Sequence, residues 1–263
     1  MAIGVFGLQV AYRLKRLEVM SANDTHGWFG GGSPGPLSTV NRIDFSNDTG
    51  TANVRGLLSS ARYGATTGNS NYGWFGGGNL PAVATVDRID FSNDSATASP
   101  RSPLSVSRSR LAATGNSNYG WFGGGYIPGS AVLSTVDRID FSNDSSTTSP
   151  RGPLSLSRSF LTATGNSNYG WFGGGIFPAV STVDRIDFSN DSATASVRGV
   201  LSASRGYLAA TGNSNYGWFG GGFPGPLTVD RIDFSNDSAT ASVRGSLSPG
   251  GRYDLAATSN TNK

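Results

Sequence analysis

The phrase GNSNYGWFGGG, from Gly115 to Gly125, occurs unchanged at 68–78, 165–175 and 212–222, and in altered form (NDTHGWFGGG) at Asn23–Gly32. Successive tryptophans in these phrases are separated by 46, 47, 50 and 47 residues. A fixed period of this size is typical of repeat architectures such as solenoids and propellers. The five tryptophans are Trp28, Trp74, Trp121, Trp171 and Trp218.

The composition fits a β protein with many tight turns. The chain has 263 residues, of which 37% are hydrophobic and 38 are glycine, and it contains no cysteine. That length suits one repeat domain. The lack of cysteine excludes disulfides, a thiol nucleophile and thiolate metal ligands.

Charge is spread evenly over the repeats. Of the 20 Lys and Arg residues, 15 are arginines at three repeated positions, and of the 17 Asp and Glu residues, 14 are aspartates at three others. The repeats therefore contribute 15 positive and 14 negative charges, and no basic stripe of the kind that binds phosphate backbones is present in the sequence. We expect no nucleic-acid partner.

Each copy divides into four short segments. In one copy they are Arg110–Thr114 (RLAAT), Tyr119–Gly123 (YGWFG), Ser134–Ser142 (STVDRIDFS) and Thr147–Leu154 (TTSPRGPL). The third alternates apolar and polar side chains, as a strand does. The fourth carries prolines, which confine a strand to a sheet edge. Four antiparallel strands in a unit of about 47 residues predict the blade of a β-propeller.

The number of segments predicts a closed ring. The repeats begin at Gly27 with a second-strand phrase, and Tyr253–Thr258 (YDLAAT) near the end matches a first-strand phrase. We therefore expect this last segment to complete the N-terminal blade, which would give an all-β, five-bladed β-propeller with no open sheet edge. The predicted domains are an arm at 1–26 and a propeller at 27–263.

The repeat resembles the kelch repeat. The resemblance rests on Ser107-Arg108, the apolar run Leu111–Thr114, Trp121–Gly125 and Val136–Asp140, and it covers about residues 27–258. The chain departs from kelch by having Ala-Ser-Pro or Ala-Ser-Val where the family has a tryptophan near the fourth strand. In its residues the repeat looks closer to the kelch-like propellers among virion proteins of tailed, especially marine, bacteriophages. That resemblance implies a virion structural role and location, such as a tail or capsid-decoration component.

The N-terminal arm has an apolar alternation of its own. Its apolar side chains alternate with other residues in a strand pattern, although helical spacing is also satisfied. No run is long enough for a membrane helix, and the N-terminus lacks the features of a secretory signal. We expect the arm to dock on other virion proteins or to cover one end of the domain. Its apolar residues are Phe6, Leu8, Val10, Tyr12 and Leu14.

The repeated residues suit structure better than chemistry. No helix start and no Lys or Ser/Thr at a fixed offset follow the triple glycine Gly123–Gly125, as a phosphate loop would require. Near-identical aspartates offer equal environments, whereas glycoside hydrolysis needs one acid and one base. The turn Ser142–Ser145 has too few oxygens for calcium. We expect no enzyme activity, no metal and no cofactor, although tryptophans stacking on sugars remain an alternative use of the repeat.

Variation between copies marks the expected binding surface. The loops after each triple glycine differ, and strand alternation places them at the same end as the variable links between the fourth strand and the next first strand. A divergent face is free for recognition, and exposed apolar residues beside prolines favour binding. We expect this face to contact a host-surface glycan or protein or a neighbouring virion protein, and a free lectin-type propeller is the alternative. The candidate residues are Leu80, Tyr126, Ile127, Pro128, Ile176, Phe177, Pro178, Phe223 and Pro224.

Overall fold

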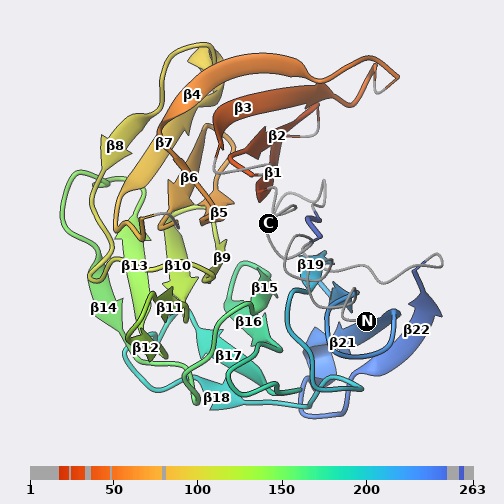
Figure 1. The fold of residues 1–263 in the computed structure, drawn as a ribbon. Coiled ribbons are helices and arrows are strands. Elements are labelled where there is room, and N and C mark those ends of the chain that lie inside the picture. The colour runs from red at the N-terminus through yellow and green to blue at the C-terminus, as the bar shows by residue number, and fades with distance from the viewer. Residues whose placement is uncertain are drawn as a thin grey trace, which may run out of the picture.

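The computed structural model describes residues 18–23, 25–32, 37–47, 49–78, 81–247 and 255–257. Their strands form five four-stranded antiparallel sheets, here called sheets 1 to 5 in chain order, and one two-stranded sheet. The five large sheets follow one another around a common centre (Figure 1). The expected all-β class and the four-stranded antiparallel units are confirmed.

Sheets 1 and 2 each follow chain order from the centre outward. Sheet 1 contains β1 (Glu18–Asn23), β2 (His26–Gly30), β3 (Leu37–Asp44) and β4 (Asn53–Arg62). Sheet 2 contains β5 (Ala65–Gly68), β6 (Tyr72–Gly76), β7 (Val86–Asp90) and β8 (Ser99–Arg101).

Sheets 3 to 5 repeat this order, and a small hairpin and two short 3-10 turns complete the elements. Sheet 3 contains β9 (Ala112–Gly115), β10 (Tyr119–Gly123), β13 (Val136–Asp140) and β14 (Ser149–Arg151). Sheet 4 contains β15 (Thr162–Gly165), β16 (Tyr169–Gly173), β17 (Val183–Asp187) and β18 (Ser196–Val197). Sheet 5 contains β19 (Ala209–Gly212), β20 (Tyr216–Gly220), β21 (Thr228–Asp233) and β22 (Ser242–Ser246). The hairpin is β11 (Tyr126–Ile127) with β12 (Ala131–Val132), and the 3-10 turns are Phe91–Asn93 and Phe234–Asn236.

The uniform turns of each unit are held by polar side chains. The Asn116 side-chain oxygen accepts hydrogen bonds from the backbone N–H groups of Asn118 and Tyr119 at 2.9 and 3.0 Å. At the end of the third strand, Asp140 accepts from the Ser142 backbone N–H at 2.9 Å and from its hydroxyl at 2.7 Å. Asn and Asp are suited to such turns because their short side chains fold back on the local backbone. These turns set the register of each strand pair.

Each tryptophan of sheets 1 to 4 joins its sheet to the next one. Trp121 stacks on Phe188 of sheet 4, with ring centroids 3.8 Å apart and planes 6° from parallel. Its indole Nε1 donates to the Asp191 carboxylate at 2.9 Å. The same stacking and hydrogen bonding recur at Trp28 with Phe91 and Asp94, Trp74 with Phe141 and Asp144, and Trp171 with Phe234 and Asp237.

The first glycine of the triple glycine leaves room for a neighbouring ring. A Cβ added at Gly123 would lie 2.7 Å from a carbon of the Phe172 ring, which belongs to sheet 4. The next glycine, Gly124, has φ +69°, a left-handed conformation that disfavours other residues. The triple glycine is therefore explained by packing between sheets and by a tight turn.

Buried ion pairs hold the link between sheets to the third strand. Arg108, just before the first strand of sheet 3, lies 3.0 Å from Asp137, and both side chains are 0% exposed. Burial lowers the pKa of the Arg108 guanidinium, and the neighbouring Asp137 charge opposes that effect. The same pair recurs as Arg62–Asp87, Arg158–Asp184 and Arg205–Asp230.

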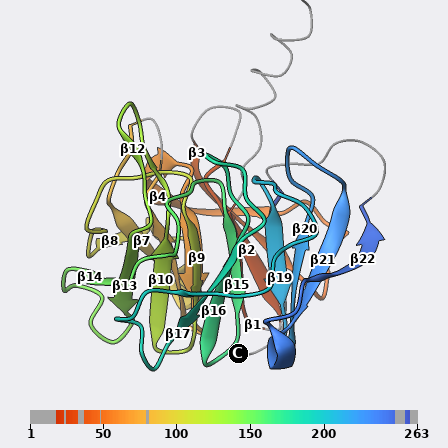
Figure 2. The same cartoon turned by 90° about the horizontal axis from the view of Figure 1, so that it is seen from below.

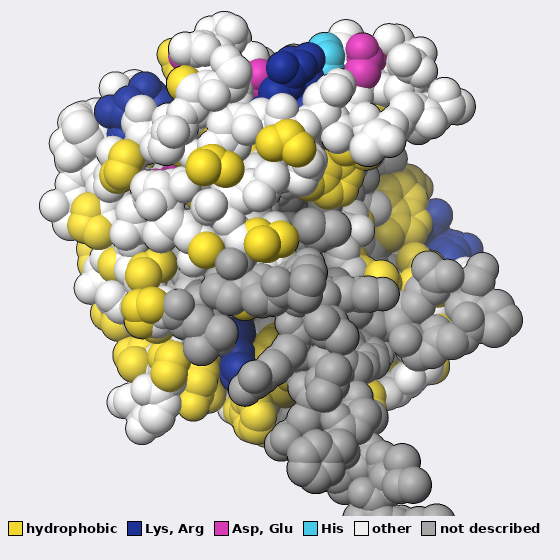
Figure 3. All heavy atoms as spheres, turned by 45° about the horizontal axis from the view of Figure 1, so that its top comes forward, with side chains coloured by type: hydrophobic (Ala, Val, Ile, Leu, Met, Phe, Trp, Pro, Cys, Tyr) yellow, Lys and Arg dark blue, Asp and Glu magenta, His cyan; other side chains and the backbone are white. Residues whose placement is uncertain are grey.

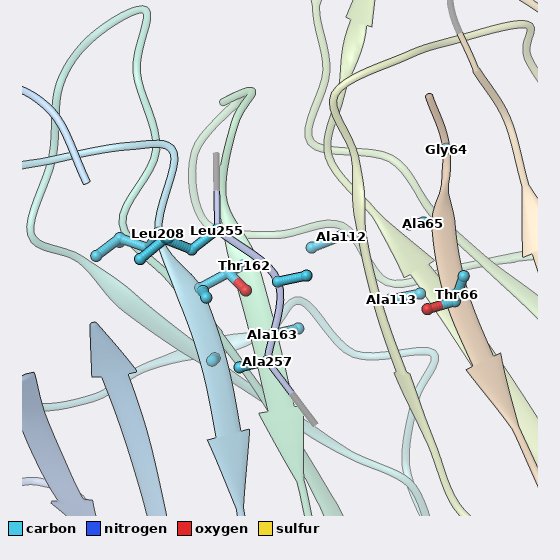
Figure 4. Close-up of a pocket in the computed structure, with 13 residues that line it drawn as sticks. Gly64, Ala65, Thr66, Ala112, Ala113, Thr162, Ala163, Leu208, Leu255 and Ala257 are labelled. Atoms are coloured by element: carbon cyan, nitrogen blue, oxygen red, sulfur yellow. The ribbon is translucent and has the colours of Figure 1, made fainter. Parts of the chain in front are cut away.

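The prediction that the C-terminal segment forms the innermost strand of the N-terminal sheet is wrong. The innermost strand of sheet 1 is β1, which pairs with β2 in antiparallel register from Glu18–Gly30 to Asn23–His26. Of the segment predicted at Tyr253–Thr258, the structure describes residues 255–257 and assigns them to no strand. They line a central cavity of about 130 Å³ together with residues of β5, β9, β15 and β19 (Figure 4).

The position of β1 also shows that part of the predicted N-terminal arm belongs to sheet 1. Residues 18–23 lie inside the segment expected to dock elsewhere, but they pair within sheet 1. The arm residues Phe6, Leu8, Val10, Tyr12 and Leu14 lie outside the described residues. Within the described ranges, the structure has no helix with the length and apolarity needed to cross a membrane.

Candidate functional site: the loop face

The variable segments meet at one end of the sheets, as the sequence predicts. In sheets 3 to 5, backbone hydrogen bonds of 2.8–3.2 Å join the link before the innermost strand to the loop after the triple glycine of the same sheet. We call this end the loop face. Figure 2 shows the β11–β12 hairpin projecting there beyond the large sheets. The joined pairs are Ser109 with Tyr126, Ser159 with Ile176 and Gly206 with Phe223.

The candidate residues on the loop face differ in exposure. Phe177 is 60% exposed and Phe223 is 39% exposed, which is high for large apolar side chains. Pro128, Pro178 and Pro224 are exposed, whereas Tyr126, Ile127 and Ile176 are half-buried. Leu80 lies outside the described residues. Each described loop therefore presents a different apolar surface to solvent.

An arginine lies between aromatic rings on this face. The Arg110 guanidinium is 4.4 Å from the centre of the Phe160 ring and 5.0 Å from that of Tyr126. The Phe160 and Tyr207 rings are 3.9 Å apart. Cation–π contacts of this kind stabilise the arginine while leaving aromatic edges available. We call Arg110, Tyr126, Phe160 and Tyr207 the aromatic–arginine cluster.

Three members of the cluster have a strained backbone. Arg110, Phe160 and Tyr207 have φ values of +59°, +54° and +58°, respectively, a region that non-glycine residues rarely adopt. Such strain costs about 1–3 kcal/mol for each residue and is concentrated at functional sites. Backbone hydrogen bonds run from the Phe160 N–H to the Arg110 carbonyl and from the Tyr207 N–H to the Phe160 carbonyl, at 2.9 and 2.8 Å. These bonds hold the three residues in a row, one or two positions before Ala112, Thr162 and Leu208, which line the central cavity.

Sequence reasoning missed Arg110, Phe160 and Tyr207 as site residues. They precede the apolar first-strand phrase, at a position where the copies differ while the phrase itself varies little. The large but non-identical side chains at this one repeated position were the sequence feature that could have indicated a binding site. The structure adds the contact of Arg110 with Tyr126, which sequence spacing alone does not reveal.

Four of the five tryptophans are not available to a ligand. Trp28, Trp74, Trp121 and Trp171 are at most 1% exposed, because each lies between two sheets. A sugar cannot stack on them in this structure. The alternative in which the repeated tryptophans form sugar sites therefore does not hold for these four.

The repeated aspartates are used within the structure. Asp137 is paired with Arg108, and Asp191 lies 3.1 Å from Arg138 and 3.5 Å from Arg151. A serine hydroxyl hydrogen bond lowers the pKa of Asp187 in the turn. No group of three or more His, Asp or Glu side chains within the described ranges is placed to hold a metal ion. The arrangement of these carboxylates supports folding.

On the molecular surface, hydrophobic side chains gather toward the lower left of Figure 3, and Lys and Arg side chains lie in separate small groups.

Comparison of the sequence with models of known protein families finds no match, and comparison with curated proteins also finds none. We therefore infer the function from the loop face and from the sequence of the repeat.

Proposed function

We propose that the five large sheets are the blades of a kelch-like β-propeller and that the protein is a non-catalytic binding component. The observation that carries this proposal is the contrast between the two ends of the molecule. The repeated turns at one end are uniform, while the loop face displays different apolar side chains in each copy, including exposed Phe177 and Phe223. Exposed aromatic residues on a rigid scaffold favour recognition of a partner.

The biological setting that we propose is the virion of a tailed bacteriophage. Support comes from the resemblance of the repeat sequence to that of kelch-like virion proteins. In this setting the N-terminal residues before β1 attach the protein to other virion proteins. The loop face then points outward toward a host-surface glycan or protein, or toward a neighbouring virion protein.

A free glycan-binding propeller is the second candidate. The observation that favours it is the aromatic–arginine cluster, because the half-buried Arg110 guanidinium can recognise carboxylates or hydroxyl groups and the edges of the neighbouring rings can contact a sugar. This candidate predicts one site at the aromatic–arginine cluster, instead of five equivalent tryptophan sites. A glycan array with the purified protein, and with Arg110→Ala as its variant, separates it from protein binding.

The main experiment compares wild type with the double variant F177A/F223A. We expect the double variant to bind host cells or purified particles at least tenfold more weakly, because it loses two exposed aromatic contacts. Val197→Ala is the matched control, since Val197 is 57% exposed on an outer strand and belongs to none of the variable loops. Equal binding by the wild type and the double variant would contradict a role for this face. Immunogold electron microscopy of phage particles tests the virion location separately.

A further inference from the structure

The contact between neighbouring sheets has two complementary faces. The tryptophan face of a sheet carries the strand-two Trp and the first glycine of the triple glycine. The phenylalanine face carries the strand-two Phe and, from the third strand and its turn, an Ile and a second Phe. In the joint between sheets 3 and 4, Trp121 and Gly123 pack on Phe172, Ile186 and Phe188. Four such joints connect sheets 1 to 5.

Among the residues that the structure describes, the tryptophan face of sheet 5 has no such neighbour. Trp218 is half-buried, whereas its four counterparts are at most 1% exposed. Arg231 makes no ion pair with any described residue, while its counterparts Arg42, Arg88, Arg138 and Arg185 lie 3.0–3.1 Å from an aspartate of the next sheet. Of the described part of the chain, a Cβ added at Gly220 would meet only Val229 and Leu247 of the same repeat, and one added at Gly245 would meet no atom within 4 Å.

The phenylalanine face of sheet 1 is exposed in the same way. Phe45 is 37% exposed, and Phe29 and Ile43 are half-buried. The counterparts of Phe29, namely Phe75, Phe122, Phe172 and Phe219, are 0% exposed, and the counterparts of Ile43 are at most 4% exposed. Sheet 1 therefore displays the surface that sheets 2 to 5 each bury against the sheet before them.

We propose that the tryptophan face of sheet 5 closes onto the phenylalanine face of sheet 1 of the same chain, as a fifth copy of the joint. The two faces carry the same side chains as the four joints already made, so their shapes match. They also belong to one chain and are the two ends of the series around the centre in Figure 1. An intramolecular contact of this kind has a high effective concentration. In the closed joint Trp218 stacks on Phe45, and the Phe29 ring lies over Gly220.

One component distinguishes this joint from the others. The third strand of sheet 1 has Asn41 where the other sheets have Asp87, Asp137, Asp184 and Asp230. Those four aspartates are 0% exposed and each is paired with a buried arginine. The fifth joint therefore closes without the Asp–Arg ion pair that the other four contain. This inference rests on the proposed five-blade architecture and is independent of what the loop face binds.

Distances between spin labels test the closure. The chain has no cysteine, so labels attach only at introduced sites. Val54, Val197 and Val243 occupy equivalent, exposed positions on the outer strands of sheets 1, 4 and 5. The V197C/V243C pair spans an internal joint, and the V243C/V54C pair spans the proposed one. Closure predicts the same distance distribution for both pairs in double electron–electron resonance. A consistently longer distance for V243C/V54C would overturn the proposal.

Glycine substitutions give a second, label-free test. Gly199 is the counterpart of Gly245, and a Cβ there would lie 1.8 Å from the Ala239 carbonyl oxygen of the next sheet. Gly199→Ala should lower the thermal midpoint strongly in either state. Gly245→Ala should lower it comparably if the fifth joint is closed, because its Cβ would then meet the sheet 1 turn. An unchanged midpoint for Gly245→Ala would show that sheet 5 remains open at this face. Loop-face binding by the same variants is measured separately, so that the two proposals can fail independently.

Discussion

Replacing Asp137 with Asn removes one partner of a buried ion pair. The Arg108 and Asp137 side chains are both 0% exposed and lie 3.0 Å apart, so the variant leaves a guanidinium charge buried without a carboxylate. Breaking a buried pair in this way costs about 3–5 kcal/mol. The Asn oxygen can still accept the Ser105 backbone N–H, which donates to Asp137 at 3.0 Å in the wild type. The predicted loss therefore comes mainly from the unpaired arginine.

The double variant R108M/D137N tests that explanation. It removes the charge but keeps most of the side-chain volume, so we expect it to lose less than half as much unfolding free energy as Asp137→Asn alone. Asp140→Asn is the control, because Asp140 accepts hydrogen bonds in a solvent-exposed turn and its replacement should cost about 1 kcal/mol. Urea unfolding followed by both tryptophan fluorescence and circular dichroism checks whether the repeats unfold together. A loss below about 1 kcal/mol for Asp137→Asn, or no recovery in the double variant, would refute the reasoning.

Two further predictions concern the turns and the joints between sheets. Trp121→Phe should lower the unfolding free energy by about 1.5–3 kcal/mol, because Asp191 loses the indole hydrogen bond of 2.9 Å while an aromatic ring remains. Urea unfolding measures this loss. An unchanged unfolding free energy would show that Arg138 alone satisfies the Asp191 carboxylate. Hydrogen bonds from Ser92 and Ser189 lower the pKa of Asp90 and Asp187 below the ordinary value of 3.8. Their stabilising contribution is therefore complete above about pH 4 and is lost as pH falls through the lower folded-state pKa. The thermal midpoint should fall below pH 4, and less steeply in the double variant D90N/D187N; equal slopes for the two proteins would contradict this assignment.

Sequence periodicity was sufficient to predict the four-stranded units and the place of the variable loops. Alternation in Ser134–Ser142 predicted the third strand, and the observed strand, Val136–Asp140, lies within that segment. The position of the loop face followed from strand direction and is confirmed by the Ser109–Tyr126 bridge. These features are local, so residue pattern and turn chemistry determine them.

The first strand of sheet 1 was predicted incorrectly because sequence similarity competed with chain connectivity. Leu255–Ala257 repeats the Leu208–Ala210 phrase, whereas Glu18–Asn23 has little likeness to it. However, β1 and β2 are separated by only two residues and form a hairpin, while pairing of the C-terminal segment with β2 would close a loop of more than 200 residues. Loop-closure entropy increases with length. The local hairpin is therefore favoured despite its weaker match to the repeat.

The contacts of Phe160 with Arg110 and with Tyr207 could not be predicted because they cross from one sheet to the next. Arg110 and Phe160 are 50 residues apart in sequence, and their proximity depends on the rotation between sheets 3 and 4. That rotation is set by the buried joint, in which Trp121 stacks on Phe188. The packing between sheets thus requires the same residues at each joint. The cluster residues Arg110, Phe160 and Tyr207 are held in equivalent positions by that packing, but their side chains can differ. A repeat of this kind can change what it binds by substitution at the loop face while its sheets keep the same packing.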